Sequence, residues 1–184
     1  MRLIIVSGAT ATGKTTIAKQ VADSLGYALY SKDIIKEALF DSQTKASHGY
    51  FWYERHAKDI FFREIEKSIS QDTSIIAESN FMKNDKRRLK SLLNKNVLVA
   101  EIYCSARGFI RLRRFVSRGE GTIRHKAHRD RRWYLAVFIE CLLKYVGIEW
   151  PYGPVGISGK MINVDTTDFS KVNFENILEF AKKS

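Results

Sequence analysis

The stretch from residue 3 to residue 16, LIIVSGATATGKTT, constrains the fold of this chain more than any other part of it. Its first residues are apolar, as in a buried strand of a parallel sheet, and the rest match the pattern G-x-x-x-x-G-K-[ST] at every fixed position. Such a loop turns its backbone N–H groups toward phosphate oxygens, which requires glycine where a side chain would block the approach. The helix that follows presents its positive end to the same phosphates. The pattern predicts a nucleoside triphosphate site rather than a glycine-rich surface turn.

Individual residues of this loop have separate expected roles. We expect Lys14 to bridge the β- and γ-phosphates and the Thr15 hydroxyl to ligate Mg²⁺. The remaining loop residues are expected to surround the phosphates: Gly8, Ala9, Thr10, Ala11, Thr12, Gly13 and Thr16.

Four further short apolar segments follow the loop, and helical patterns separate them. The apolar segments cover residues 27–30, 73–77, 97–104 and 161–164. Helical periodicity covers residues 14–25, 34–40, 54–70, 84–94, 106–117, 132–146 and 170–182. Five strands that alternate with helices predict a parallel sheet with right-handed crossovers in a three-layer α/β fold. No linker rich in glycine, serine or proline divides the 184 residues, so we expect a single domain.

Two acidic residues follow the second and third expected strands. Ligands meet the carboxyl ends of parallel strands, so Asp33 is expected at the same sheet edge as the phosphate loop. Equally well, Asp33 could cap its own helix or be an acid of the first turn, where the positive end of the helix dipole stabilises its negative charge. Glu78 follows the third strand, where a carboxylate can support the Mg²⁺ shell. The alternative for Glu78 is a surface acid at a strand end.

Four consecutive aromatic residues, Tyr50 to Tyr53, precede the expected helix 54–70. They could form one wall of a substrate pocket. The interpretation that we favour slightly is that they pack this helix onto the sheet.

The net charge of +11 is concentrated in one segment. Residues 105–132 hold ten lysines and arginines against two acids, a net charge of +8, which indicates a polyanion bound locally. Arg107, Arg111, Arg114 and Arg118 share one face of the expected helix 106–117, a glycine-containing break covers 119–122, and a basic loop covers 123–130. Helix, basic loop and helix are the arrangement of a mobile lid over a triphosphate. The four arginines would repel one another without an anion, so we favour phosphate binding over a solvated basic face.

The sequence predicts a cytoplasmic protein with reduced thiols. The chain begins with no secretory hydrophobic region, and the apolar stretch 134–146 contains Glu140 and Lys144 and is too short to cross a membrane. Cys104 and Cys141 form no C-x-x-C pattern, so we expect both in the core.

Several segments together resemble the P-loop kinases. They are residues 8–15, 31–37 (SKDIIKE), 78–81 (ESNF), the arginine-bearing segment and 164–167 (VDTT). More narrowly, they resemble the kinases known as AAA-type ATP-binding proteins, a group akin to zeta toxin, polynucleotide 5′-hydroxyl kinase and chloramphenicol phosphotransferase. This resemblance implies a P-loop fold with a helical, basic lid at about 106–132, ATP and Mg²⁺ as cofactors, and transfer of the γ-phosphoryl group to a hydroxyl.

The resemblance also implies roles for particular residues. Asp33 matches the acid that orients or deprotonates the acceptor hydroxyl, and Arg114 and Arg118 match an R-x-x-x-R pair that contacts the phosphates and covers the adenine. The loop that borders the base corresponds to Asp165, Thr166 and Thr167. Residues 124–130 resemble a lid motif, R-H-P-G-H-x-D, in which Lys126 and Ala127 replace Pro-Gly, so the resemblance assigns no role to His125 and His128. Some related kinases carry a carboxylate where this chain has Ser31, so a second metal ligand from that strand is not implied.

Three functions are compatible with these residues. The first is a kinase for a small hydroxyl compound such as a nucleoside, nucleotide, sugar or antibiotic. The second is a kinase for the 5′-hydroxyl of a nucleic acid, which the basic lid and the stacking aromatics favour. The third is an ATP-binding switch with slow hydrolysis. A guanine-specific switch is disfavoured, because no N-K-x-D stretch follows the fourth strand.

Overall fold

The computed structural model describes residues 1–42, 48–119, 125–128, 131–145, 153–157 and 159–183, with backbone alone at 131–134, 136, 144 and 145. In these parts, five parallel strands form one sheet in the order β2-β3-β1-β4-β5. The strands are β1 (Arg2–Gly8), β2 (Ala28–Ser31), β3 (Ile75–Glu78), β4 (Leu98–Ser105) and β5 (Met161–Asp165). The predicted five-stranded parallel α/β fold is confirmed.

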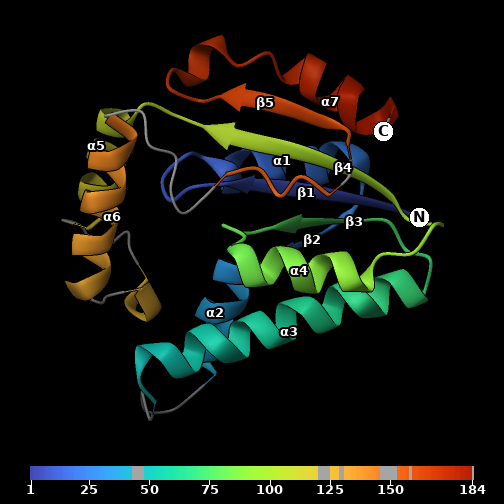
Figure 1. The fold of residues 1–184 in the computed structure, drawn as a ribbon, viewed down its shortest axis with the longest axis horizontal. Coiled ribbons are helices and arrows are strands. Elements are labelled where there is room, and N and C mark those ends of the chain that lie inside the picture. The colour runs from blue at the N-terminus through green and yellow to red at the C-terminus, as the bar shows by residue number, and fades with distance from the viewer. Residues whose placement is uncertain (43–47, 120–124, 129–130, 146–152, 158, 184) are drawn as a thin grey trace.

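Helices cover both faces of the sheet (Figure 1). One face packs against α1 (Lys14–Leu25) and α7 (Phe174–Lys183), and the other packs against α3 (Tyr50–Ser70) and α4 (Lys83–Leu92). Strand β1 supplies both cores, because Ile4 and Val6 join the first and Leu3 and Ile5 join the second. Alternation along a strand that is buried on both faces explains its continuous apolar sequence.

The remaining helices lie toward the carboxyl ends of the strands. They are α2 (Lys32–Asp41), α5 (Gly108–Gly119), the 3₁₀ helix η1 (Lys126–His128) and α6 (Arg131–Tyr145). Figure 1 shows α5 and α6 side by side beyond the tips of β4 and β5. A small apolar cluster of Phe115, Val137, Cys141 and Ala11 joins these two helices to the phosphate loop.

Three helix boundaries differ from the sequence prediction. Helix α3 begins at Tyr50 rather than at 54, so the aromatic run is its first turn. Helix α4 begins at Lys83 and ends at Leu92, where the sequence predicted 84–94, and neither Asn84 nor Asp85 is the residue that precedes its first turn. Met82 precedes that turn, and the Asp85 carboxylate accepts the Met82 N–H at 3.0 Å. The last expected helix divides into a 3₁₀ turn, η2 (Phe169–Lys171), and α7, because the Asp168 side chain caps the turn.

Other expectations concerned the cysteines and the membrane. Cys104 and Cys141 are free and buried, as predicted. Among the described helices, none combines the length and the apolar character needed to cross a membrane. Residues 120–122 of the glycine-containing break, and residues 123, 124, 129 and 130 of the basic loop 123–130, lie outside the described residues.

Gly8 marks the point where β1 enters the phosphate loop, and its surroundings exclude a side chain. Its φ is +134°, and a Cβ there would lie 2.2 Å from the carbonyl oxygen of Cys104 on β4. We expect Gly8→Ala to lower the free energy of unfolding by about 3 kcal/mol, measured by chemical denaturation, because the strand backbone cannot move aside. Gly26→Ala is the matched control, since Gly26 has φ +67° and a Cβ there would have no atom within 4 Å, and should cost only about 1 kcal/mol. Equal losses would contradict this steric explanation.

Candidate active site

A cavity of about 470 Å³ lies at the carboxyl edge of the sheet. Residues of the phosphate loop and α1 line one side of it, together with Asn80, Phe115 and Arg118. The other side, called the acceptor side below, is lined by Ser31, Lys32, Asp33, Ile34, Glu37, Tyr50, Glu54, His125 and His128. Thus Lys14, Thr15, Asp33 and Arg118, which the sequence analysis selected independently, face one cavity.

Contacts from distant segments hold the phosphate loop in shape. Within the loop, the Thr12 hydroxyl donates to the Ala9 carbonyl at 2.8 Å, and the Lys14 ammonium donates to the same oxygen at 3.0 Å. The buried Thr166 hydroxyl donates to the Thr12 carbonyl at 2.5 Å, and Arg111 Nε donates to the Thr10 carbonyl at 2.9 Å. The loop is therefore braced by β5 and α5 as well as by its own side chains.

Glu78 ends β3 and lies beside the start of the phosphate loop, because it pairs with Val6 in the sheet register. It is buried and accepts hydrogen bonds from the Ser31 hydroxyl at 2.5 Å and the Thr15 hydroxyl at 3.4 Å, while Lys14 lies 3.9 Å away. Burial raises the pKa of Glu78 against the opposing effect of Lys14. A buried carboxylate next to a threonine hydroxyl is a suitable setting for a divalent cation.

These residues fit a Mg²⁺ that is held mainly by phosphates. Mg²⁺ usually keeps several waters and takes one or two carboxylates together with substrate phosphate oxygens. Thr15 and Glu78 offer a hydroxyl and a carboxylate of that kind. The described residues contain no group of three or more His, Cys, Asp or Glu side chains that could hold a metal ion alone.

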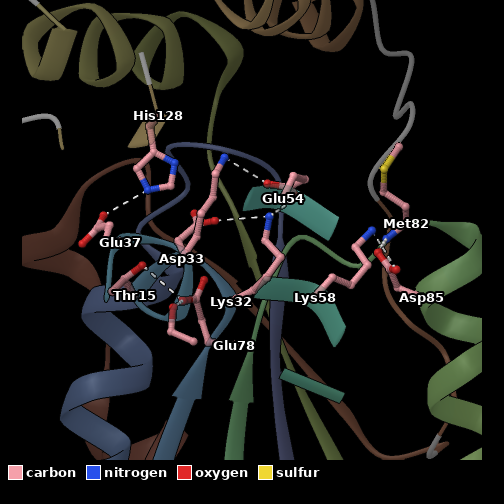
Figure 2. A network of polar contacts seen from close by, with 12 residues as sticks. Thr15, Lys32, Asp33, Glu37, Glu54, Lys58, Glu78, Met82, Asp85 and His128 are labelled. Carbon is pink, nitrogen blue, oxygen red and sulfur yellow. Dashed lines mark hydrogen bonds and ion pairs between the residues drawn. The ribbon is translucent and has the colours of Figure 1, made fainter. Parts of the chain in front are cut away.

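Asp33 belongs to a network of two buried lysines and two acids, part of which Figure 2 shows. The Lys32 ammonium lies 2.5 Å from the Glu54 carboxylate and 3.3 Å from the Asp33 carboxylate, and Lys36 lies 3.1 Å from Glu54. Burial opposes the charge of Asp33, but Lys32, His128 and Lys14 outweigh it and hold the Asp33 pKa well below its usual range. Burial also opposes the charge of Lys32, yet Asp33 and Glu54 raise the pKa of its ammonium. Asp33 is therefore ionised, and 57 % of its side-chain surface stays open.

The sequence analysis did not identify Lys32, Lys36 and Glu54 as site residues. The two lysines are four residues apart, which places them on one face of α2, and this spacing was a usable signal. Glu54 lies on a different helix, α3, so its pairing with them depends on tertiary packing that the sequence does not reveal.

The arginines of α5 do not form one uniform basic face. Arg111 is buried, forms an ion pair with Glu140 of α6 and braces the loop, so the expectation that the four arginines repel one another without an anion is wrong for Arg111. Arg114 donates from Nη2 to the carbonyls of Thr166 and Thr167 at 2.7 and 3.3 Å, and its guanidinium lies 4.9 Å from the centre of the Phe169 ring. Its buried Nη1 has no hydrogen-bond partner among the described atoms. Arg118 lines the cavity.

Asp165, Thr166 and Thr167 lie beside the phosphate loop but do not line the cavity. The Asp165 carboxylate accepts the Thr167 N–H at 2.8 Å, and the Thr167 hydroxyl accepts the Arg107 N–H at 3.0 Å. Together with Arg114, this loop forms a second, polar surface next to the phosphate loop.

Two histidines connect η1 to α2. His125 Nε2 lies 3.1 Å from the Asp41 carboxylate, and His128 Nε2 lies 3.0 Å from Glu37. Arg124, Arg129 and Asp130 of the same sequence motif lie outside the described residues.

The aromatic run matches neither expectation completely. Tyr53 is buried against Phe40 of α2, with ring centroids 5.1 Å apart, whereas Tyr50 lines the cavity with the Lys36 ammonium 3.6 Å from its ring centre. Phe51 points outward with 69 % exposure.

Replacement of Lys32 tests the network. Lys32→Met leaves Glu54 and Asp33 without their shared cation, so we expect the free energy of unfolding to fall by about 3 kcal/mol at neutral pH. The folded pKa values of Asp33 and Glu54 are both lowered, so their charged forms stabilise the fold above their ordinary values of 3.8 and 4.5 and do so less at lower pH. The difference between the two proteins in urea denaturation should shrink below about pH 4. Lys183→Met removes an exposed ion pair with Glu179 and should change stability little; an equal loss there would contradict the role of burial.

The fold and the site together define the class of protein. A parallel sheet with a phosphate loop between β1 and α1 is the fold of the P-loop kinases. Residues 3–136 match the family model described as an AAA domain, and the chain belongs to this family. Among curated proteins, the chain has no significant sequence match.

Solved structures with the same fold include several kinases. A candidate kinase from Chloroflexus aurantiacus has a TM-score of 0.79 and 26 % identity, over 99 % of this chain and 94 % of that one. A sugar kinase from a Janibacter species has a TM-score of 0.57 and 16 % identity, over 100 % and 93 % of the two chains. A chain of the Pnkp1/Rnl/Hen1 RNA repair complex has a TM-score of 0.58 and 14 % identity, over 83 % and 47 %. The last two similarities concern the fold alone.

Proposed function

We propose that this protein is an ATP-dependent kinase that transfers the γ-phosphoryl group to a hydroxyl of a small molecule. The observation that carries the proposal is that the phosphate loop and the ionised Asp33 face one cavity. The similarity to solved kinase structures supports it. We further propose that the chain forms a single domain with residues 106–132 as its lid.

On the donor side, Lys14 would stabilise the charge that develops on the transferring group, and the loop N–H groups would hold the phosphates. Thr15 would ligate Mg²⁺, and Glu78 would hold the water shell of the ion. When bound, Mg²⁺ would neutralise part of the phosphate charge. Arg118 would contact the phosphates from the lid. Nη1 of Arg114 has no hydrogen-bond partner among the described atoms, which supports a role for this residue in binding the nucleotide. Asp165, Thr166 and Thr167 would border the base.

On the acceptor side, Asp33 would accept a hydrogen bond from the acceptor hydroxyl and direct its oxygen at the γ-phosphorus. The new P–O bond forms as the bond from the γ-phosphorus to the β–γ bridging oxygen breaks, and ADP leaves. The hydroxyl proton passes to Asp33 and then to solvent. Because transition states for phosphoryl transfer are loose, little deprotonation is needed before attack, and a carboxylate with a low pKa is sufficient.

A kinase for a nucleic acid 5′-hydroxyl is the second candidate. The net charge of +8 in residues 105–132 and the fold shared with a chain of an RNA repair complex favour it.

The test is transfer of label from γ-labelled ATP to separate pools of nucleosides, sugars, antibiotics and 5′-hydroxyl oligonucleotides. We expect a labelled small molecule in at least one pool, which Asp33→Asn abolishes. Label only in the oligonucleotides, with affinity that falls steeply with salt, would establish the second candidate instead. ATP hydrolysis without a labelled acceptor in any pool would favour an ATP-binding switch.

A further inference from the structure

We infer that the acceptor is a small polyhydroxyl compound that is uncharged or cationic, and that compounds bearing a phosphate or a carboxylate are rejected. This inference rests on the proposed kinase function and specifies its substrate class. It follows from the separation of charge between the two sides of the cavity.

Among the cavity-lining residues that the structure describes, the cations that remain open to a ligand lie on the phosphate-loop side. Lys14 belongs to the loop, and neither Lys19 nor Arg118 forms an ion pair with any side chain that the structure describes. A triphosphate bound at the loop would meet these charges, as the proposed donor requires.

The cations on the acceptor side are already neutralised. Lys32 contacts both Glu54 and Asp33 (Figure 2). Lys36 contacts Glu54 and the Tyr50 ring. A phosphate or carboxylate on the acceptor would have to displace one of these buried contacts. Breaking a buried ion pair leaves a carboxylate unpaired, which is costly.

Among the described groups of this side, carboxylates outnumber lysines. Asp33, Glu37 and Glu54 line the cavity, against the two ammonium groups of Lys32 and Lys36. The partner of Glu37 is His128, and burial lowers the pKa of this imidazole although Asp33 and Glu37 act in the opposite direction. The His125 imidazole contacts the Asp41 carboxylate, not a carboxylate that lines the cavity. The carboxylates of this side thus outnumber its lysines by three to two, and the partner of Glu37 is an imidazole rather than a lysine or arginine, which disfavours anions and favours ammonium groups.

These carboxylates also have the hydrogen-bonding capacity that a polyol requires. The Glu37 side chain is 38 % exposed and that of Glu54 is 26 % exposed, so acceptor sites on their oxygens remain open. An ionised carboxylate accepts up to about four hydrogen bonds, and those from hydroxyl donors are short and strong. The cavity of about 470 Å³ also has to hold the transferring phosphoryl group, which limits the acceptor to a small molecule.

The test compares matched acceptors that differ in charge. The full chain is given γ-labelled ATP with a hexose panel, an amino-sugar panel, the hexose phosphates, the hexonic acids and a 5′-hydroxyl oligonucleotide. We expect the best neutral or amino acceptor to exceed the best anionic one in kcat/KM by at least about tenfold. A best acceptor that carries a phosphate or carboxylate, the oligonucleotide included, would overturn the inference and leave the kinase proposal standing. Absence of label from every acceptor would overturn the kinase proposal and this inference with it.

The variant Glu37→Gln tests whether the Glu37 carboxylate causes the preference for neutral or cationic acceptors. It should raise the acceptor KM by about tenfold, leave the KM for ATP unchanged, and reduce the preference for an amino sugar over its neutral analogue. If Glu37 had only a structural role, Glu37→Gln would lower kcat/KM equally for the amino sugar and its neutral analogue, and the preference between them would not change. Glu66→Gln, at an exposed position of α3, is the control and should change none of these values. An unchanged preference in a folded Glu37→Gln protein would contradict the assignment.

Discussion

Lys14→Ala should reduce transfer of the γ-phosphoryl group by at least about 100-fold, with most of the loss in kcat. The Lys14 ammonium is held 3.0 Å from the Ala9 carbonyl and 3.9 Å from Glu78, inside the loop that would hold the phosphates. A charge placed there is oriented before the substrate binds, so its effect increases as negative charge develops on the transferring group. Alanine removes the charge without altering the glycines that shape the loop.

The measurement is single-turnover transfer from labelled ATP, with binding of a fluorescent ATP analogue recorded separately. Lys182→Ala is the matched control, because Lys182 is an exposed lysine on α7, outside the candidate site. It should behave as the wild-type protein does. A folded Lys14→Ala protein with unchanged turnover of the true acceptor would show that the phosphate loop is not the donor site.

The phosphate-loop side of the cavity was predictable because its determinants are local in the sequence. A strand, a glycine-bounded loop and a helix follow one another within residues 2–25, and their geometry leaves few alternatives. Glu78 was also predictable, since it ends a short apolar strand. Its hydrogen bond from Ser31 was not, because that contact depends on β2 lying next to β3.

The side of the cavity around Asp33 was less predictable because its residues come from separate elements. Glu54 reaches Lys32 across the interface between α3 and α2, and Glu140 reaches Arg111 from α6. Helical periodicity fixes the face on which a residue lies but not the partner that packs against that face. The sequence therefore placed the arginines on one face of α5. It could not show that Arg111 is paired with Glu140 whereas Arg118 lines the cavity.

Asp33→Asn should lower kcat by about 100-fold or more while the KM for ATP stays near its wild-type value. Asparagine has nearly the same shape, but its amide cannot take the proton or attract the acceptor hydroxyl as strongly. Steady-state kinetics with the identified acceptor gives both constants. An Asp33→Asn protein with wild-type kcat would mean that Asp33 only stabilises the first turn of α2, the alternative that its position at the helix start allows.

The pH dependence separates these two roles. Lys32, His128 and Lys14 keep the pKa of Asp33 below its ordinary value of 3.8, so the carboxylate is charged throughout the neutral and mildly acidic range. The rate should therefore show no loss from protonation of Asp33 as the pH falls from 7 toward 5. In Lys32→Met, Asp33 loses its nearest cation, so its pKa rises and the acidic limb of kcat should move toward neutral pH. An identical acidic limb in the two proteins would show that protonation of Asp33 does not control turnover, even if Asp33→Asn is inactive.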